Sequence, residues 1–247
     1  MDPAAYKELA ELEGRHWWFV GRRRIIEALL ERLALPQDAR ILEIGCGTGG
    51  NLEMLARYGE LRAAEYDDGA RAVAAAKGVA REIAPCRLPD ELPFASEKFD
   101  LIVLFDVLEH IEDDIACLRA IRKRMSERGW LVVTVPAFQF LWSGNDEYNH
   151  HFRRYSRAQL ETVVRAGGFR PAYASYFNFW LFPAAAAVRF VKNLFFAERE
   201  EARSDLALPT DTLNGALAWL FASERVAMGR FSLPFGVSCI LSARPTL

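Results

Sequence analysis

The chain has 247 residues, of which 51% are hydrophobic and 26% charged, and its formal net charge is −2. The hydrophobic content excludes an intrinsically disordered chain, and the near-neutral charge argues against a nucleic-acid partner, because phosphate binding needs a basic surface. The length suits one large domain, and the four widely spaced cysteines indicate a reduced, cytoplasmic protein rather than a disulfide or zinc framework.

The first predicted elements are two helices. Residues 6–13 have a helical composition, and residues 22–33 place five aliphatic side chains on one helical face. A turn at residues 35–38 ends the second helix. We therefore expect a helical N-terminal cap over residues 1–36, followed by the main domain over residues 37–247.

Strands and helices then alternate. The predicted strands are residues 40–44, 61–66, 79–84, 99–105 and 129–135, and the predicted helices between them are residues 50–58, 68–77 and 111–126. Helical crossovers of this kind join parallel strands and cover both faces of the sheet. The pattern predicts a doubly wound α/β fold.

The pattern changes after the fifth strand. Residues 137–155 are aromatic and polar without a clear period, which is typical of a functional loop or lid. The remaining predicted elements are a helix capped by Ser156, a strand at 169–177, an apolar helix, a charged linker at 198–205, a helix near 213–228 and a last strand at 236–243. Residues 178–234 are therefore expected to be a helical insertion before the last strand.

One apolar segment leaves two interpretations open. Residues 172–188 contain no charge, but Asn178 and Pro183 interrupt them and the run is short for a membrane span. A buried strand that leads into an apolar helix accounts for the pattern. The alternative is an interfacial element in residues 172–196 that contacts a membrane or holds a lipid-like substrate.

A glycine-rich loop follows the first predicted strand. In the segment LEIGCGTGG, Gly45, Gly47 and Gly50 satisfy the G-x-G-x-x-G pattern. Glu65 stands at the end of the next strand, where a carboxylate can bind ribose hydroxyls. The loop predicts a nucleoside cofactor, but by itself it does not separate NAD from S-adenosylmethionine.

Glu43 helps to separate these two cofactors. Its carboxylate precedes the loop by two residues, where the pyrophosphate of a dinucleotide would be repelled. S-adenosylmethionine has no phosphate and carries a cationic amino group and a sulfonium. The acid therefore favours S-adenosylmethionine.

Four motifs in order resemble the class I S-adenosylmethionine-dependent methyltransferases, with the small-molecule branch as the nearest match. They are the Glu-x-Gly-x-Gly-x-Gly segment at 43–49, the acid Glu65, LPFASEKFDLIV at 92–103 and DVLEHI at 106–111. The resemblance covers about residues 37–180 and implies a Rossmann-like sheet of seven strands with the last one antiparallel. The cofactor residues that it implies are Glu43, Gly45, Cys46, Gly47, Gly49, Glu65, Tyr66, Phe105 and His110. Of these, Glu43 and the glycines would line the methionine end, and Tyr66 would pack on the adenine.

The adenine end departs from the family pattern. Family members often carry an acid four residues before the LPF motif, where this chain has Leu88. We expect backbone groups of Arg87 and Leu88, or the side chain of Asp90, to contact the adenine instead.

The segment around residues 146–156 is the strongest candidate on the substrate side. It resembles a D-x-x-x-H-x-R-R-Y-[ST] element of methyltransferases of cell-surface glycan or lipid pathways, through Asp146, His150 or His151, Arg153, Arg154 and Tyr155. The functional interpretation makes a histidine the general base with Tyr155 beside it, and the arginines a clamp for an anionic acceptor. The alternative is a structured lid whose arginines pair with Asp146 and Glu147.

Two further features of the sequence are a tryptophan pair before a basic cluster and a possible pair of metal ligands. Trp17 and Trp18 would cap the substrate, or else belong to an amphipathic helix with Arg22, Arg23 and Arg24 in solvent. Asp146 and His150 could mimic two metal ligands, but a third is missing, so no metal site is expected.

The sequence thus predicts transfer of a methyl group from S-adenosylmethionine to a small or lipid- or glycan-linked acceptor, with oxygen as the preferred atom and S-adenosylhomocysteine as the product. The expected location is cytoplasmic, with peripheral contact at the inner face of a membrane left open. The alternatives are an NAD-dependent oxidoreductase and a non-catalytic partner protein that binds S-adenosylmethionine.

Overall fold

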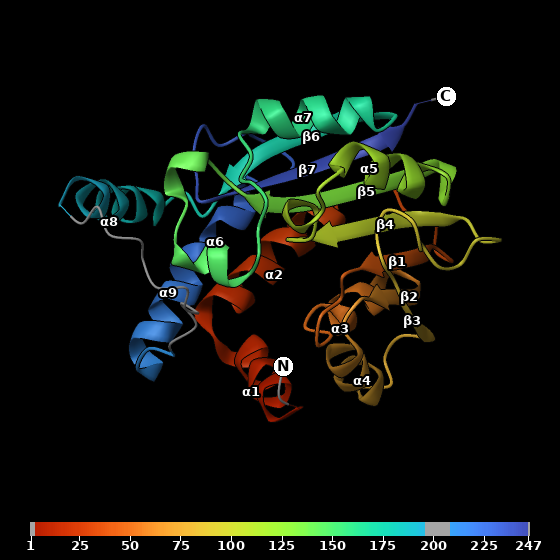
Figure 1. Cartoon of the computed structure of the whole chain (residues 1–247), viewed down its shortest axis with the longest axis horizontal. Helices are drawn as coiled ribbons and strands as arrows, with labels where there is room; N and C mark the ends of the chain where they lie inside the picture. Colours follow the sequence, from red (N-terminus) through yellow and green to blue (C-terminus); the bar gives the residue numbers. More distant parts are fainter. Residues whose placement is uncertain (1–2, 196–207, 247) are drawn as a thin grey trace.

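A sheet of seven strands forms the centre of the molecule (Figure 1). The computed structural model describes residues 3–195 and 208–246, and the predicted charged linker at 198–205 lies outside them. The strands are β1 (Arg40–Ile44), β2 (Glu60–Glu65), β3 (Glu82–Pro85), β4 (Phe99–Phe105), β5 (Met125–Pro136), β6 (Phe169–Phe177) and β7 (Ser238–Pro245). Their order is β3-β2-β1-β4-β5-β7-β6, and β7 is antiparallel to both neighbours. The predicted Rossmann-like sheet with an antiparallel last strand is confirmed.

Helices connect the strands, and polar caps fix several of their starts. The helices are α1 (Pro3–Arg15), α2 (Trp17–Leu30), α3 (Leu52–Leu55), α4 (Asp68–Ala76), α5 (Asp114–Arg122), α6 (Gly144–Tyr148), α7 (Arg157–Ala166), α8 (Phe182–Phe195) and α9 (Asp211–Ser223), with short 3₁₀ turns η1 (Ala56–Tyr58), η2 (Leu108–His110), η3 (Gln139–Leu141) and η4 (Glu224–Val226). Asp67 and Asp113 each accept a hydrogen bond from a first-turn amide of α4 and α5. Ser156 forms a capping box with Gln159 at the start of α7. These caps satisfy amides that the helix itself leaves unpaired.

Alternate strand residues face two separate cores. Leu42 of β1 and Ile102 of β4 pack with α5 and α7, whereas Ile41 and Leu101 pack with α2, α3 and α9. All four are fully buried, because successive strand side chains point to opposite faces and both faces carry helices (Figure 1).

Helix α2 near the N-terminus and the late helix α9 meet on one face of the sheet. Helix α2 packs along α9, and the backbone N–H of Trp17 donates a hydrogen bond to Asn214 Oδ1 at 2.8 Å. A Cβ atom at Gly21 would come within 2.5 Å of the Phe221 ring, so only glycine permits this close approach. The domain limits predicted at residue 36 and over 178–234 stay predictions, but α1, α2, α8 and α9 fall within those segments.

Several predicted boundaries differ from the structure. The helix predicted over 111–126 is the shorter α5, because Asp113 caps it late and the chain already enters β5 at Met125. Strand β3 begins at Glu82 rather than at residue 79. The irregular segment 137–155 contains the short helix α6, which a capping box between Ser143 and Asp146 stabilises.

The apolar segment at residues 172–188 forms the second half of β6 and the first half of α8. Its strand part is buried from Ala174 to Phe177, as the strand–helix interpretation predicts. Within the described ranges, no helix has the length and apolarity needed to cross a bilayer.

Candidate active site

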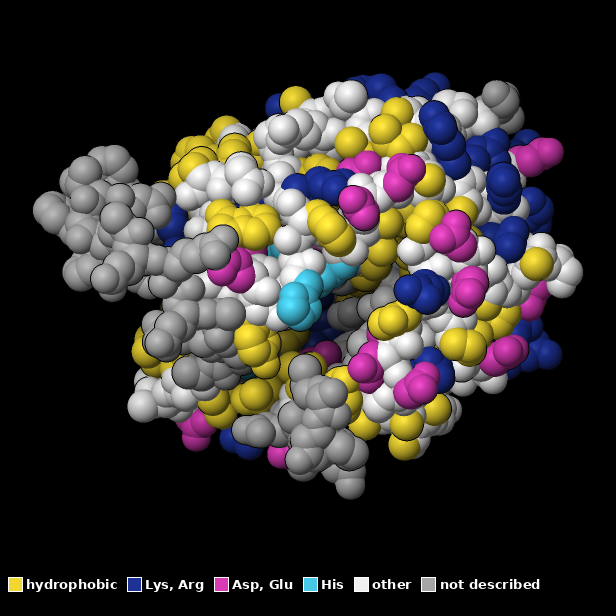
Figure 2. Space-filling view, viewed as in Figure 1, with side chains coloured by type: hydrophobic (Ala, Val, Ile, Leu, Met, Phe, Trp, Pro, Cys, Tyr) yellow, Lys and Arg dark blue, Asp and Glu magenta, His cyan; other side chains and the backbone are white. Residues whose placement is uncertain are grey.

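The candidate site lies where the strand order reverses, between β1 and β4. In open α/β sheets this switch point forms a crevice at the carboxyl ends of the strands. The glycine loop leaves β1 there, and the segment Asp106–His110 leaves β4 beside it. A Cβ atom at Gly45 would approach Val107 Cγ2 to 2.4 Å, so the two segments are in contact. Figure 2 shows histidine side chains at the rim of a hollow near the centre of this face.

The glycine loop has the shape of a cofactor cradle. Gly45, Gly47 and Gly49 have φ angles of 72°, 55° and 85°, which favour glycine. A Cβ atom at Gly47 would meet nothing within 4 Å, so this part of the loop is open. The carboxylate of Glu65 accepts hydrogen bonds from the N–H groups of Gly47 and Asp67 at 2.8 and 2.9 Å. Glu65 is thereby held at the edge of the cradle.

Glu43 is fully buried beneath this loop. One carboxylate oxygen accepts a hydrogen bond from Asn51 Nδ2 at 2.9 Å, and the other has no hydrogen-bond partner among the described residues. Burial raises the pKa of Glu43 to about 8, although the Asn51 hydrogen bond opposes the shift. A buried carboxylate with an open oxygen fits a cationic ligand group and disfavours a phosphate.

The other predicted cofactor residues differ in exposure and in the hydrogen bonds that they already make. Tyr66 is 67% exposed just after β2, where it is free to cover a planar ring, whereas Cys46 and Phe105 are buried. The backbone N–H and C=O of Arg87 already pair with Glu91 at 3.1 and 2.7 Å. Leu88 is half-buried and Asp90 is exposed, and contact of the Leu88 backbone or the Asp90 side chain with the adenine stays a prediction.

A buried ion pair joins α2 to the end of β4. Arg22 Nη2 lies 2.7 Å from Asp106 Oδ2 and donates to Thr134 Oγ1 at 3.0 Å, and that hydroxyl donates to Asp106 Oδ1 at 3.0 Å. Asp106 has a φ of 57°, which is uncommon for a non-glycine residue and typical of a constrained site. The interpretation that placed Arg22 in solvent is wrong, because this side chain is buried and paired with Asp106 and Thr134.

The two tryptophans predicted on the substrate side pack against protein groups. The Trp18 ring lies 5.0 Å from the guanidinium carbon of Arg22, and the Trp17 ring meets the Phe221 ring edge-on at 5.9 Å. Both rings are half-buried. Contact of either ring with a substrate remains a prediction.

Asp146 organises the lid segment from a fully buried position. It accepts hydrogen bonds from the Ser143 N–H and hydroxyl and from two Arg154 nitrogens, and it pairs with His151 Nδ1 at 2.8 Å. Burial alone would raise the pKa of Asp146, but the hydrogen bonds from His151 and Arg154 outweigh it and hold the pKa well below its usual value. The carboxylate is therefore ionised.

His151 stands against His110 at the crevice. The two ring centroids are 4.6 Å apart in an edge-to-face arrangement. Although part of the His110 side chain is exposed, the protein atoms packed around its ring lower its pKa to about 4, and the neighbouring His151 adds to this effect. His150 is exposed and has a φ of 56°. Of the two candidate bases, His151 is the one that the structure pairs with Asp146.

The remaining lid residues have partners inside the protein. Arg153 Nη1 and the Tyr155 hydroxyl both donate to Asp114 Oδ2, at 2.9 and 2.8 Å. Tyr155 is buried, and burial with the Asp114 contact raises its pKa. Arg154 pairs with Asp146, as the lid interpretation predicts, but Arg153 pairs with Asp114 rather than Glu147. A catalytic role for Tyr155 and an arginine clamp stay predictions.

Two acids at the site were not singled out by the sequence analysis. The Thr48 hydroxyl donates a hydrogen bond to Glu13 Oε2 at 2.5 Å, so α1 contacts the glycine loop. No local sequence pattern predicts this contact. Glu109 is fully buried beside His110. It belongs to the DVLEHI motif, and its position shortly after a predicted strand could have marked it as a candidate site residue.

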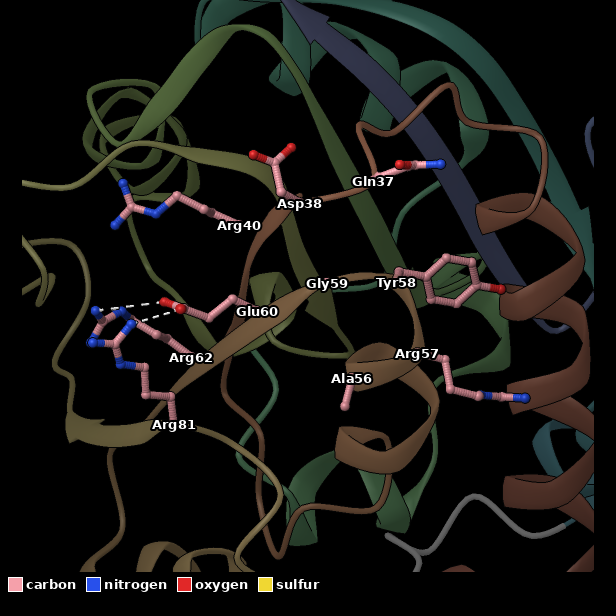
Figure 3. A pocket seen from close by; sticks show the side chains of 10 residues that line it. All are labelled: Gln37, Asp38, Arg40, Ala56, Arg57, Tyr58, Gly59, Glu60, Arg62 and Arg81. Atoms are coloured by element: carbon pink, nitrogen blue, oxygen red, sulfur yellow. Dashed lines mark hydrogen bonds and ion pairs between the residues drawn. The ribbon is translucent and has the colours of Figure 1, made fainter.

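A separate cavity of about 660 Å³ lies at the opposite edge of the sheet, near the amino ends of β1 and β2 (Figure 3). Its arginines are paired: Arg40 and Arg62 with Glu97, Arg81 with Glu60 and Arg57 with Glu27. It contains none of the predicted site residues. Since its charges are compensated and it is remote from the glycine loop, we assign it no part in the chemistry.

Comparisons with known proteins agree with this geometry. The family described as "Methyltransferase domain" matches residues 18–173. A probable S-adenosylmethionine-dependent methyltransferase of Mycobacterium tuberculosis is 28% identical over 167 residues, which are 66% of this chain and 59% of that protein. The chain thus matches somewhat less than two thirds of that relative's length.

A second relative and a solved structure extend the likeness. The malonyl-[acyl-carrier protein] O-methyltransferase of Enterobacter lignolyticus is 26% identical over 80% of this chain and 81% of its own. The phosphoethanolamine N-methyltransferase 2 of Haemonchus contortus, solved with S-adenosyl-L-methionine, shares the fold with a TM-score of 0.57 at 17% identity, over 89% of this chain and 52% of that one.

The cradle of glycines, the open oxygen of Glu43 and the acid Glu65 fit S-adenosylmethionine, and the family match covers more than half of the chain. The chain belongs to the class I S-adenosylmethionine-dependent methyltransferase family.

Proposed function

We propose that this enzyme methylates a hydroxyl oxygen of a small, lipid-linked or glycan-linked acceptor, with His151 as the general base. The cofactor supplies a methyl group that is already activated on a sulfonium. The observation that carries the proposal is the Asp146–His151 pair, which stands beside His110 at the crevice.

The pair is suited to proton transfer. Asp146 Oδ1 lies 2.8 Å from His151 Nδ1, and this contact favours the tautomer with the proton on Nδ1, in which the lone pair of the other ring nitrogen can accept the proton of the acceptor hydroxyl. When that nitrogen takes the hydroxyl proton, the buried carboxylate stabilises the imidazolium that forms. Arg154 and Ser143 keep the carboxylate fixed during this step.

The cofactor end of the crevice complements this arrangement. Glu43 favours a cationic methionine end and Glu65 favours ribose hydroxyls, so the two acids orient the donor from both sides. Orientation is the main requirement, because in-line methyl transfer needs alignment and the exclusion of water.

Aromatic side chains near the lid support an acceptor with an apolar part. Phe138 stacks on Tyr176 at 4.7 Å and meets Phe182 at 5.7 Å, and Phe182 meets Phe235 at 5.1 Å. Close by, Phe140 is 54% exposed. Such a surface suits a hydrocarbon chain or a membrane interface, and this is why we include lipid-linked acceptors and peripheral membrane contact. The likeness to an O-methyltransferase supports oxygen as the acceptor atom.

Neighbouring histidines provide a matched test. His151→Asn should lower methyl transfer by about two to four orders of magnitude, the usual contribution of a general base. His150→Asn should leave it unchanged, since asparagine tolerates the left-handed backbone at that exposed position. Transfer is measured from methyl-labelled S-adenosylmethionine into a lipid extract and, separately, into a pool of hydrophilic metabolites.

Binding of S-adenosylhomocysteine to both variants is the control. It should match that of the unmodified enzyme. Equal rates for the two variants, or loss of cofactor binding in His151→Asn alone, would contradict the base assignment.

A further inference from the structure

Three potential metal ligands meet at the acceptor side of the crevice. Glu109, His110 and His151 each offer one ligand atom, and these atoms all lie within 4.8 Å of one another. Glu109 and His110 belong to the turn after β4, whereas His151 comes from the lid. The backbone N–H of Phe152 donates to the Glu109 carbonyl at 2.8 Å, which fixes the lid against the turn.

Glu109 is the most unusual member of this cluster. Its side chain is 0% exposed, and neither carboxylate oxygen accepts a hydrogen bond from another described residue. Arg22 and Arg154 are nearby cations, but Arg22 is already engaged by Asp106 and Thr134, and Arg154 by Asp146. A buried carboxylate without a partner is costly, so a bound cation would satisfy a group that the fold leaves open.

Both histidines are oriented as metal ligands commonly are. His151 Nδ1 pairs with the Asp146 carboxylate, and the His110 ring hydrogen-bonds to the backbone of Asn149. In metal sites the second ring nitrogen usually makes such a bond to a carboxylate or carbonyl, which leaves the first nitrogen directed at the metal. Asp146, which the sequence offers with His150 as a possible metal ligand, therefore lies behind His151 and supports it. It is not itself one of the three ligands.

We propose that Glu109, His110 and His151 bind a divalent transition-metal cation, of which Zn²⁺ and Mn²⁺ are the best candidates. Two imidazoles and one carboxylate suit such ions, and three protein ligands leave coordination positions open for an acceptor oxygen. Donor atoms around zinc lie roughly 3.3 Å apart, so binding requires only a small convergence of the three side chains.

The proposal rests on the proposed methyl transfer to oxygen and gives His151 a different role in it, as a metal ligand in place of the general base. A cation here would bind the acceptor hydroxyl and lower its pKa, so that the proton leaves to water. The acceptor oxygen then forms the new O–C bond, the S–C bond of the donor breaks, and its electron pair stays on sulfur as S-adenosylhomocysteine. In this arrangement His151 is a ligand, and the cation replaces it as the group that activates the hydroxyl.

Calorimetry of the full chain tests the site directly. The protein is stripped with a chelator and titrated with zinc chloride and, separately, manganese chloride. We expect one cation per chain, with affinity reduced about tenfold or more by Glu109→Gln. Glu112→Gln, on an exposed side chain three residues away, is the matched control and should bind like the unmodified protein.

Two further readouts keep the result unambiguous. Thermal unfolding should show that Glu109→Gln is folded, because the substitution removes an uncompensated buried carboxylate. The stripped protein is also titrated with S-adenosylhomocysteine. Absence of cation binding, or equal affinity in Glu109→Gln, overturns the metal site. If S-adenosylhomocysteine still binds in that case, the methyltransferase assignment stands and His151 acts as the base.

Discussion

Replacing Glu43 by glutamine should remove the pH dependence of S-adenosylmethionine binding. The free enzyme holds Glu43 protonated at neutral pH, because burial raises its pKa to about 8. A cationic ligand favours the ionised form, so binding expels a proton below pH 8 and affinity rises with pH. Glutamine has nearly the same shape and no proton to release.

The size of the effect follows from the pKa. If Glu43 is ionised in the complex, the dissociation constant should fall about 25-fold between pH 6.0 and pH 7.5. The amino group of the ligand stays mostly protonated over this range, so it adds little. At pH 7.5, Glu43→Gln should weaken binding roughly 10- to 150-fold, as expected for the loss of a hydrogen bond to a charged group.

Titration calorimetry in buffers of different ionisation enthalpy measures both quantities. The unmodified enzyme should release close to one proton per ligand at about pH 6.5, and Glu43→Gln should release almost none. Glu53→Gln, on the exposed side of α3, should behave like the unmodified enzyme. The reasoning fails if the unmodified enzyme and Glu43→Gln share one pH profile, or if no proton is released.

Three further substitutions probe the site and its frame. Glu65→Ala should weaken cofactor binding by about 1–3 kcal/mol, because a charged partner of the Gly47 amide and of the ribose is lost, and unchanged affinity in calorimetry would refute the ribose assignment. Arg22→Met should lower the unfolding free energy by about 2–3 kcal/mol, since it leaves a partly buried acid unpaired, whereas the exposed Arg24→Met should change it little in urea denaturation. Tyr155→Phe should lower the unfolding free energy by about 1 kcal/mol, because the buried hydrogen bond to Asp114 is lost, and a large loss of turnover in the folded variant would support the predicted catalytic role of Tyr155.

Several local elements of the structure could be predicted from the sequence. Strands at residues 40–44, 99–105 and 169–177 have the predicted bounds, because each is a short apolar run with buried faces. The position of the glycine loop was also predictable, since its residues follow one another between one strand and the next helix. The start of β5 was missed because residues 126–128 are polar and look like a loop.

Contacts between distant segments could not be predicted. Arg22 meets Asp106, and Glu13 meets Thr48, only because α1 and α2 fold back over the switch point of the sheet. The partner of Arg153 is Asp114 on α5, and spacing along the lid offers no sign of it. Such pairs depend on tertiary packing, which hydrophobic periodicity along the chain does not predict.

The Arg22–Asp106 pair makes residue 36 a poor place to divide the molecule. A fragment that begins at residue 37 would lose the guanidinium that holds Asp106, and it would uncover the apolar face that Ile25 and Leu29 now protect. Asp106 and buried Glu109 would then lie near each other without the Arg22 guanidinium, which offsets the charge of both. We therefore expect the first helices to fold together with the glycine loop, and a fragment that lacks them to be less stable than the whole chain.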